Sequence, residues 1–332
     1  MNDGLRAPRT VPESGHAPAR YKTAGDDART PVVSAITPVY NGERYLEAAL
    51  RSALAQSFSG LEIIVLNDGS SDRSGEIARD YAATYPQTVR YFEQANAGLC
   101  AARNAAMVEA RGRYLALLDC DDLWMPQHLS QAVAALEADP GTVLVHADVR
   151  FVDEHDTVTA LFLDRGRWSR WADDPFRAIL LRHEHVACPT AVFRRDMAEA
   201  LGGFDLRYSY LGCEDRDLWL RLCLRGRVRH LSYHGADYRV HGGGMSRNRE
   251  RMLRARQLLV ERMRDFPEGR RLHSAAQAAL ALSEAEECSP EREYQRMWQA
   301  YLQAVHLNPR DTRGWRGLLR ASAAYRFGGG GS

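Results

Sequence analysis

Three aspartates stand within four positions at the end of an apolar run in this chain of 332 residues. The run YLALL, residues 114–118, leads directly to Asp119, Asp121 and Asp122. Carboxylates this close repel one another and raise each other's pKa, so we expect a partner of opposite charge. A divalent cation such as Mg²⁺ or Mn²⁺ favours carboxylate oxygens and would relieve that repulsion. The alternative is a cap for the helical pattern at residues 125–138, although a cap needs only one carboxylate.

Alternating strand and helix patterns place these aspartates at one edge of a predicted sheet. Apolar runs at residues 32–37, 61–67 and 114–119 each lead through a polar loop into a helical pattern. Unbroken apolar strands that alternate with helices predict a parallel sheet covered on both faces, which is a doubly wound α/β domain. Ligands of such sheets bind outside the carboxyl ends of the strands. The position of the aspartates therefore favours the metal over the cap.

The rest of the chain divides into a mixed segment and a helical segment. Strand-like alternation at residues 142–153, 158–164 and 228–241 accompanies a helical pattern at 214–226. Beyond Ser246 the sequence predicts four helices, at residues 248–265, 270–287, 290–307 and 311–326. We therefore expect a mixed sheet followed by a C-terminal helical extension.

Charge and composition exclude several classes of protein. The formal net charge is +1, so no overall positive field attracts nucleic acid. No apolar run approaches the ~20 residues that span a bilayer, and the N-terminus lacks the apolar centre of a signal peptide. The six cysteines form no CxxC pair, which indicates reduced thiols and not a disulfide framework or a zinc site. We expect a cytoplasmic protein that does not bind nucleic acid.

Seven motifs occur along the chain, and they are TPVYNGERYL, LNDGSSD, NAGLCAARN, LLDCDD, LGGFD, EDRDLWLRL and YRVHGGGMS. In type and in order they resemble the motifs of family 2 glycosyltransferases of the GT-A fold. Seven ordered motifs are far more specific than one alone. The resemblance implies a GT-A fold, related to the Rossmann fold, and an enzyme that moves a sugar from a nucleotide donor to an acceptor hydroxyl with inversion.

The resemblance also divides the chain into segments. It implies a GT-A domain at residues 31–250, with a nucleotide-binding half at 31–125 and an acceptor half at 126–250. Residues 251–327 lie outside the resemblance and form the predicted helical extension. Two end segments complete the division, a disordered leader at 1–30 and a GGGGS linker scar at 328–332.

On the donor side, the resemblance assigns eight residues to the nucleotide sugar. Asp119 would reach the ribose or a metal-bound water, and Asp68 would accept the N3–H of uracil. For Asp68, an Asx turn with a helix cap stays open as a second role, since different oxygens could serve both. For Arg103, an ion pair with a nearby carboxylate is the alternative to nucleotide binding. The donor set is Pro38, Tyr40, Asn41, Glu43, Asp68, Gly98, Arg103 and Asp119.

The resemblance implies Mn²⁺ or Mg²⁺ as the cofactor. The DxD motif of the family corresponds to Asp119 and Asp121, and the metal ligands would be Asp121 and His241. A bound metal would stabilise the diphosphate leaving group as a Lewis acid. A lone histidine is more often a hydrogen-bonded surface residue, so both interpretations of His241 stay open. Asp122 could then cap the following helix.

Single-step inversion needs one general base that takes the proton of the acceptor hydroxyl. The resemblance assigns this role to Asp215, with Glu214 either orienting it or touching the acceptor. Asp215 could also be the N-cap of the helix that follows. Asp217 fits the first turn of that helix, where an acid is favoured.

These features together predict a metal-dependent, inverting hexosyltransferase that adds one sugar, from a UDP-sugar, in surface polysaccharide or glycoconjugate biosynthesis. The acceptor would be a glycan, a lipid-linked sugar or a protein. Two alternatives are a nucleotidyltransferase that acts on sugar phosphates and a non-catalytic nucleotide-sugar-binding module with a partner-binding tail. Because the last predicted helix is basic on one face and apolar on another, it could lie on the inner face of a membrane or dock on protein, including a second copy of the chain.

Overall fold

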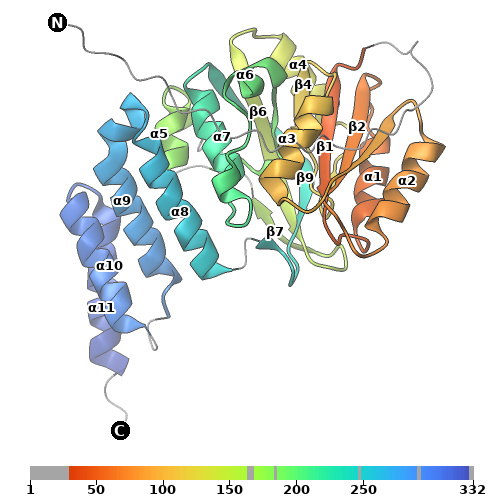
Figure 1. Ribbon diagram of the computed structural model, residues 1–332. Coiled ribbons are helices and arrows are strands. Elements are labelled where there is room, and N and C mark those ends of the chain that lie inside the picture. Colours follow the sequence, from red (N-terminus) through yellow and green to blue (C-terminus); the bar gives the residue numbers. More distant parts are fainter. Residues whose placement is uncertain (1–29, 163–167, 183–184, 246–247, 290–292, 329–332) are drawn as a thin grey trace, which may run out of the picture.

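The computed structural model describes residues 30–162, 168–182, 185–245, 248–289 and 293–328. The predictions for a disordered leader and for a linker scar therefore fall almost wholly outside the described residues. A nine-stranded sheet runs through the larger part of the molecule, and the C-terminal helices stack at one side of it (Figure 1). The strand order is β3-β2-β1-β4-β8-β6-β9-β5, and β7 pairs with β6.

The two halves of the sheet differ in strand direction. Parallel pairing joins β1 (Val33–Val39), β2 (Leu61–Asn67), β3 (Val89–Glu93) and β4 (Tyr114–Leu117). The other half is mixed and contains β5 (Leu123–Trp124), β6 (Thr142–Val152), β7 (Val158–Phe162), β8 (Val192–Arg194) and β9 (Arg227–Arg239). There β8 runs antiparallel to both β4 and β6, whereas β9 runs parallel to β6. The mixed α/β sheet confirms the predicted fold class.

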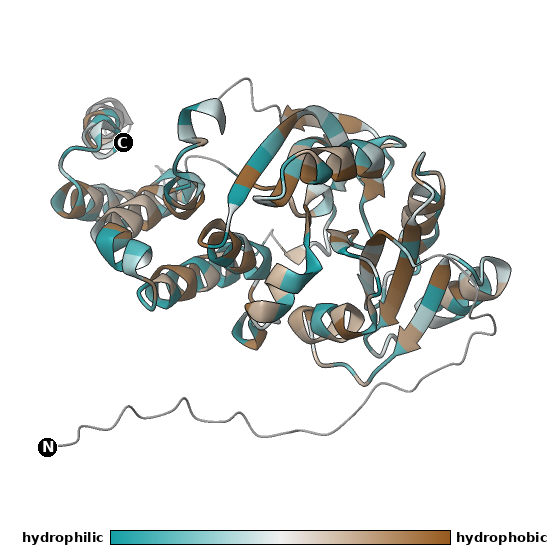
Figure 2. Cartoon of the chain, turned by 90° about the horizontal axis from the view of Figure 1, so that it is seen from above, coloured by the Kyte–Doolittle hydropathy of each residue, from teal (hydrophilic) through white to brown (hydrophobic). Residues whose placement is uncertain are grey.

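Helices cover both faces of this sheet, as unbroken apolar strands require. They are α1 (Leu46–Leu54), α2 (Ser74–Thr84), α3 (Leu99–Glu109), α4 (His128–Glu137), α5 (Pro175–Leu180), α6 (Arg195–Ala200) and α7 (Glu214–Cys223). Successive residues of β1 point to opposite faces, so Val33 and Ala35 join one apolar cluster and Ile36 joins the other. Leu50 of α1 belongs to the first cluster and Trp219 of α7 to the second. Figure 2 shows the central strands as largely hydrophobic between helices with hydrophilic outer faces.

Four helices form the C-terminal extension, α8 (Arg249–Met263), α9 (Pro267–Glu287), α10 (Tyr294–Leu307) and α11 (Thr312–Gly328). The first two belong to the main core, because Leu259, Met263 and Leu272 join the apolar cluster that contains α7. In contrast, α10 packs on α9 and α11 packs on α10, around a small separate cluster that includes Ala285, Met297, Ala300 and Ala321. The extension is therefore half integrated into the domain and half peripheral to it.

The last helix presents only part of its apolar face to the protein. Leu318 is 8% exposed, whereas Trp315 and Leu319 are 49% and 72% exposed. Contact of this helix with a membrane or with a second copy of the chain stays a prediction. Among the described helices, none combines the length and the apolar character that crossing a bilayer would require.

Candidate active site

A cleft of about 960 Å³ opens at the carboxyl ends of β1, β2 and β4, where the sequence predicts a ligand. Nine of the twelve residues assigned by resemblance line it, and they are Pro38, Tyr40, Asp68, Gly98, Asp119, Asp121, Glu214, Asp215 and His241. The other three, Asn41, Glu43 and Arg103, do not line the cleft but hold its walls in place. The topology thus gathers residues as far apart in the sequence as Pro38 and His241.

Asp68 organises the loop between β3 and α3. Its Oδ1 accepts hydrogen bonds from Gln94 Nε2 (2.7 Å) and the Ala97 backbone N–H (2.9 Å), and its Oδ2 accepts one from the Gly98 N–H (2.9 Å). The alternative role as the cap of α2 is wrong, because the carboxylate bonds to the neighbouring loop instead. Three of its roughly four acceptor positions are used, which leaves one for a ligand.

The position of Gly98 has no room for a side chain. Its φ is 86°, a conformation that L residues rarely adopt, and a Cβ here would lie 2.8 Å from the Cβ of Ser209 and 2.9 Å from the ring of Tyr210. Gly98 also precedes the first residue of α3 and donates to Asp68. The backbone of the cleft wall is therefore fixed at this point by a close approach of two segments.

Asn41 and Glu43 fasten the loop after β1 to the loop after β2. Asn41 Oδ1 accepts from the Ser71 N–H (2.8 Å), and Glu43 Oε2 accepts from the Arg73 N–H (2.9 Å). Tyr40 stands beside them with a ring that is 55% exposed and lines the cleft. The geometry gives Asn41 and Glu43 a positioning role and leaves Tyr40 as the ring that a planar ligand could contact.

The three clustered aspartates take three different partners. Asp119 Oδ1 accepts from Arg103 Nη2 at 2.6 Å, and Asp121 Oδ2 lies 2.9 Å from His241 Nε2. Asp122 is buried, and its Oδ1 accepts from the backbone N–H of Arg239 (2.8 Å) at the end of β9. Its predicted role as a cap is wrong, since α4 begins six residues later without a side-chain cap. Asp122 instead ties the aspartate loop to the second half of the sheet.

Asp121 and His241 have the spacing of a pair of metal ligands. Oδ2 and Nε2 form a hydrogen bond of 2.9 Å, and two ligands at right angles, each ~2.1 Å from a Mg²⁺ ion, would lie at a similar ~3.0 Å. Within the described residues, no group of three or more His, Cys, Asp or Glu side chains is arranged to hold a metal. The pair therefore fits a cation that takes its remaining ligands from phosphate oxygens and water, as Mg²⁺ commonly does.

Arg103 joins the aspartate loop to the start of α7. Its side chain is fully buried, with Nη2 donating to Asp119 and Nη1 donating to Glu214 Oε1, both at 2.6 Å. Its guanidinium also lies over the ring of Phe204 at 5.3 Å from the centroid. The ion-pair alternative for Arg103 is confirmed, and both of its carboxylate partners line the cleft.

The two neighbouring carboxyl groups at the start of α7, Glu214 and Asp215, both have raised pKa values. Burial raises the pKa of Glu214 to about 7, with Asp215 adding to the rise and Arg103 opposing it. Burial also raises the pKa of Asp215, while Arg216 and Arg103 oppose that shift. Asp215 is the second residue of α7 and not its cap, because the helix begins at Glu214 after a left-handed Cys213 (φ 65°). A carboxylate with a raised pKa suits general-base chemistry near neutral pH.

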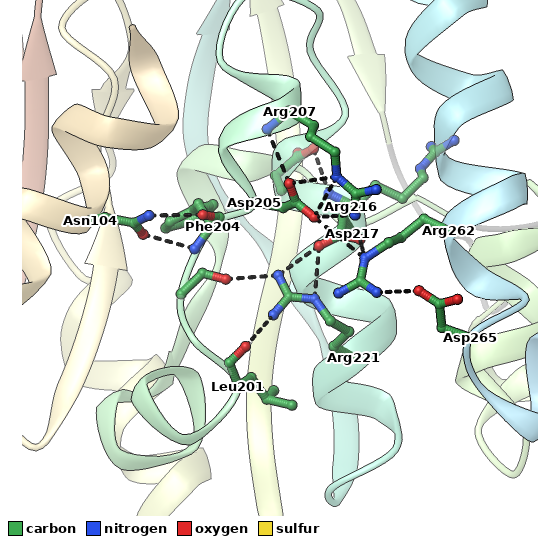
Figure 3. A network of polar contacts seen from close by, with 12 residues as sticks. Asn104, Leu201, Phe204, Asp205, Arg207, Arg216, Asp217, Arg221, Arg262 and Asp265 are labelled. Carbon is green, nitrogen blue, oxygen red and sulfur yellow. Dashed lines mark hydrogen bonds and ion pairs between the residues drawn. The ribbon is translucent and has the colours of Figure 1, made fainter. Parts of the chain in front are cut away.

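A buried polar network connects α7 with the loop that follows α6 and with α8 (Figure 3). Asp217 pairs with Arg221 at 2.6 Å, and Arg221 donates in turn to the carbonyls of Leu201 and Gly203. Arg262 of α8 reaches the same network, with its Nε 3.4 Å from Asp205 Oδ2. The prediction that Asp217 belongs to the first turn of the helix is confirmed. The C-terminal extension thus helps to set the position of the helix that carries Asp215.

Several cleft residues have no role in the sequence analysis. Arg239 is buried and donates from Nε to the Asp121 carbonyl (2.8 Å). Its place in the YRVH motif was a usable signal, as was that of Arg216 in the EDRD motif. Arg182 and Arg256, by contrast, lie in no motif, and only the fold brings them to the cleft.

Comparisons with known proteins agree with this geometry. The chain is 31% identical over 199 residues to an uncharacterized glycosyltransferase of Rickettsia typhi, covering 58% of each chain. It is 27% identical over 223 residues to UDP-Glc:alpha-D-GlcNAc-diphosphoundecaprenol beta-1,3-glucosyltransferase WfaP of Escherichia coli, covering 67% of this chain and 82% of that one. The chain therefore spans little more than half the length of the first relative.

Two solved structures have similar folds. TarS 1–349 of S. aureus in complex with UDP-GlcNAc matches with a TM-score of 0.62 at 18% identity, over 89% of this chain and 92% of that chain. Mannosyltransferase PcManGT of Pyrobaculum calidifontis, in complex with GDP-Man and Mn²⁺, matches with a TM-score of 0.55 at 21% identity, over 94% and 91%. Both are GT-A structures with a C-terminal helical region, as the sequence predicts.

The sequence pattern described as "Glycosyl transferase family 2" matches residues 34–202, which is half of the chain. The match spans the loops after β1, β2, β3 and β4 that build one wall of the cleft. The chain belongs to glycosyl transferase family 2.

Proposed function

We propose that the chain is an inverting, metal-dependent glycosyltransferase that moves one sugar from a UDP-sugar to a hydroxyl of a lipid-linked glycan. One observation carries the proposal: Asp121 with His241 and Asp215 with Glu214 line one cleft, and Arg103 connects their two walls. Family membership favours this function over a nucleotidyltransferase and over a binding module without activity. The WfaP relative's name supports a UDP-sugar and a lipid-linked acceptor.

The donor nucleotide would lie against the loops after β1, β2 and β3. Pro38 and the exposed ring of Tyr40 offer a surface for the base, and Asp68 retains one acceptor position for its N3–H. Gly98 keeps that wall free of a side chain. Asp119, held by Arg103, would accept from the ribose.

Asp121 and His241 would hold Mn²⁺ or Mg²⁺. When bound, such an ion stabilises the negative charge that develops on the departing diphosphate. Gly243 donates its backbone N–H to His241 Nδ1 (3.3 Å), so in this arrangement Nε2 carries the ring proton and donates it to Asp121 Oδ2. The segment after β9 thereby orients the imidazole toward the aspartate. A cation bound at Nε2 would require this proton to lie on Nδ1, and the contact from Gly243 would then be lost.

Asp215 would take the proton from the acceptor hydroxyl as that oxygen attacks the sugar. Burial keeps the pKa of Asp215 raised, which makes the carboxylate a stronger base than an exposed one. Glu214 would hold Arg103 and so keep the start of α7 against the aspartate loop. The proposal places the enzyme in the cytoplasm, at the inner face of the membrane where lipid-linked acceptors would be reached.

The proposal is tested by separating donor binding from transfer. Thermal unfolding of the full chain is measured with UDP-glucose and UDP-GlcNAc, with and without Mn²⁺, because a ligand of the folded state raises the unfolding temperature. We expect a shift that needs Mn²⁺, disappears with EDTA and is lost in Asp121→Ala. Asp215→Asn should keep the shift while transfer to a GlcNAc-diphosphate lipid falls about 10²- to 10⁴-fold, the usual contribution of a general base.

A matched control is Asp196→Asn, which makes the same chemical change at an exposed position on α6. It should leave both donor binding and transfer unchanged. Wild-type transfer by Asp215→Asn would refute the role of Asp215. A wild-type protein that shows no shift with any nucleotide sugar and Mn²⁺ would refute the proposed function as a whole.

A further inference from the structure

Three arginines from three separate segments line the cleft on the side away from the predicted nucleotide loops. Arg182 follows α5, Arg216 follows Asp215 in α7, and Arg256 lies on α8. In Figure 1 these helices stand together at one side of the sheet, and β2 lies at the other. Any ligand that contacts these guanidinium groups would therefore extend past Asp215, away from Asp68.

The contacts of these side chains leave much of their positive charge unbalanced. Arg256 Nη1 pairs with Glu287 Oε1, and Glu287 is the one carboxylate that forms an ion pair with any of the three within the described residues. Arg182 and Arg256 both donate to Ser283 Oγ, and Arg216 Nη2 lies 3.0 Å from His185 Nδ1. Glu287 is also shared with Arg249, at 3.7 Å. Apart from Glu214 and Asp215, which line the same cleft, the three cations therefore share one carboxylate partner among the described residues.

The crowding of these cations also lowers the pKa of groups beside them. Burial, together with Arg216 and Arg256, lowers the pKa of Arg182 to about 10. Burial and the same three arginines lower the pKa of His185 to about 3, so that this imidazole is neutral and can accept from Arg216. A protein keeps like charges this close at a free-energy cost that a bound anion would offset.

We propose that Arg182, Arg216 and Arg256 bind a phosphoryl group of the acceptor. This inference rests on the proposed function and adds the chemical class of the acceptor to it. A carboxylate is satisfied by one guanidinium fork, whereas the terminal oxygens of a phosphoryl group can accept from several. Three guanidinium groups from three segments therefore suit a phosphoryl group better than a carboxylate.

Position distinguishes this site from the binding site of the donor diphosphate. Arg216 directly follows Asp215, the residue that would receive the proton of the acceptor hydroxyl. Asp121 and His241, which suit the metal-bound donor phosphates, belong to the loop after β4 and the segment after β9. Met245 and Met252 line the same cleft and give it an apolar surface that the carbon chain of a lipid phosphate could contact.

The test uses GlcNAc 1-phosphate as the charged probe and methyl N-acetylglucosaminide as its neutral counterpart. Each is titrated at constant ionic strength into the full chain, already saturated with UDP and Mn²⁺, while the unfolding temperature is followed. We expect the charged probe alone to raise this temperature. Arg182→Gln, Arg216→Gln and Arg256→Gln should each weaken its apparent affinity about tenfold, the usual effect of losing a charged hydrogen bond.

Arg254→Gln is the matched control, because Arg254 lies on the same helix as Arg256 but is an exposed residue paired with Glu250. This variant should bind the probe as the wild type does, and Arg216→Lys should regain part of the affinity that Arg216→Gln loses. The inference is overturned if saturating UDP abolishes binding of the probe, or if the three variants and the control bind it equally. UDP binding measured on the same proteins tests the proposed function separately.

Discussion

The two ends of the cleft are held in shape by different kinds of interaction. At the nucleotide end, Asn41, Glu43 and Asp68 accept hydrogen bonds from backbone N–H groups of neighbouring loops. At the other end, charged side chains contact or crowd one another, as Arg103 does with Glu214 and as Arg182 does with its neighbours. One end is fixed by loop geometry and the other depends on charge.

This difference indicates what each end can recognise. Loops fastened by hydrogen bonds present a preformed surface, which suits a planar base whose shape and polar edge are constant. An end with opposed and unbalanced charges suits ligands and transition states whose charge changes during the reaction. Arg103 stands at the junction, since it comes from α3 and pairs with one carboxylate on each side.

Removing Arg103 should break the junction and produce the largest loss of stability. Arg103→Met leaves Asp119 and Glu214 without their shared cation, and breaking a buried ion pair typically costs about 3–5 kcal/mol. Urea denaturation of both proteins measures the change in the free energy of unfolding. Because Glu214 can take up a proton, adding Glu214→Gln to this variant should recover part of the loss.

The control for this change is Arg79→Met at an exposed pair with Glu93, where the two side chains are 50% and 46% exposed. Exposed pairs contribute about 1 kcal/mol or less, so this variant should unfold close to wild type. Equal and small losses in both variants would show that the two ends of the cleft are not joined through Arg103.

Replacing Asp68 should weaken the nucleotide end without affecting the charged end. Asp68→Asn keeps one carbonyl oxygen for Gln94 and Ala97 but replaces the oxygen that faces Gly98 with an amide. The loss of a charged hydrogen bond, about 1.5–3 kcal/mol, predicts roughly ten- to a hundredfold weaker binding of UDP. Isothermal titration with UDP in the presence of Mn²⁺ measures it.

A modified ligand separates base recognition from loop damage in this experiment. The wild type should bind UDP more tightly than N3-methyl-UDP, which lacks the N3–H, whereas Asp68→Asn should bind both alike. If the variant still prefers UDP by the wild-type factor, another group accepts the N3–H and Asp68 only shapes the loop. Its three hydrogen bonds within the protein make that comparison necessary.

Much of the fold could be predicted because the signals were local. The long strands and the helices from α1 to α4 follow continuous or periodic apolar patterns. The loops between them carry the motifs, and their place after the strands indicates where in the fold the site lies. Short strands such as β5 and β8, of two and three residues, carry no usable periodicity. Their positions depend on pairing with β9, β4 and β6, and that pairing is set by the tertiary fold.

The candidate site could be predicted as a set of residues but not as a set of contacts. Asp68 and Asp122 both resemble helix caps in sequence, yet each binds a backbone N–H of a distant segment. Arg182 and Arg256 give no signal, because they lie 74 positions apart in the sequence and only the fold brings both to the cleft. Capping rules use neighbours in sequence, and these contacts arise from neighbours in space.

The charged end can be examined most finely through the pH dependence of Glu214. Burial raises the pKa of this carboxyl from 4.5 to about 7, so the folded protein holds the proton more tightly than the unfolded chain does. The stability that this proton contributes is fully present below pH 4.5 and is lost as the pH rises through about 7. Glu214→Gln removes the titrating group, so the variant should lack this loss.

The measurement is therefore the difference in unfolding temperature between wild type and Glu214→Gln at each pH from 4.5 to 8. Burial lowers the pKa of His128 and of His185 to about 3, so both histidines oppose stability as the pH falls below their ordinary values. They are present in both proteins and cancel in the difference. We expect wild type to lose stability relative to the variant as the pH rises, with most of the change below pH 7. A difference that stays constant across this range would mean that Arg103 keeps Glu214 ionised throughout, and the charged end would then be as fixed as the nucleotide end.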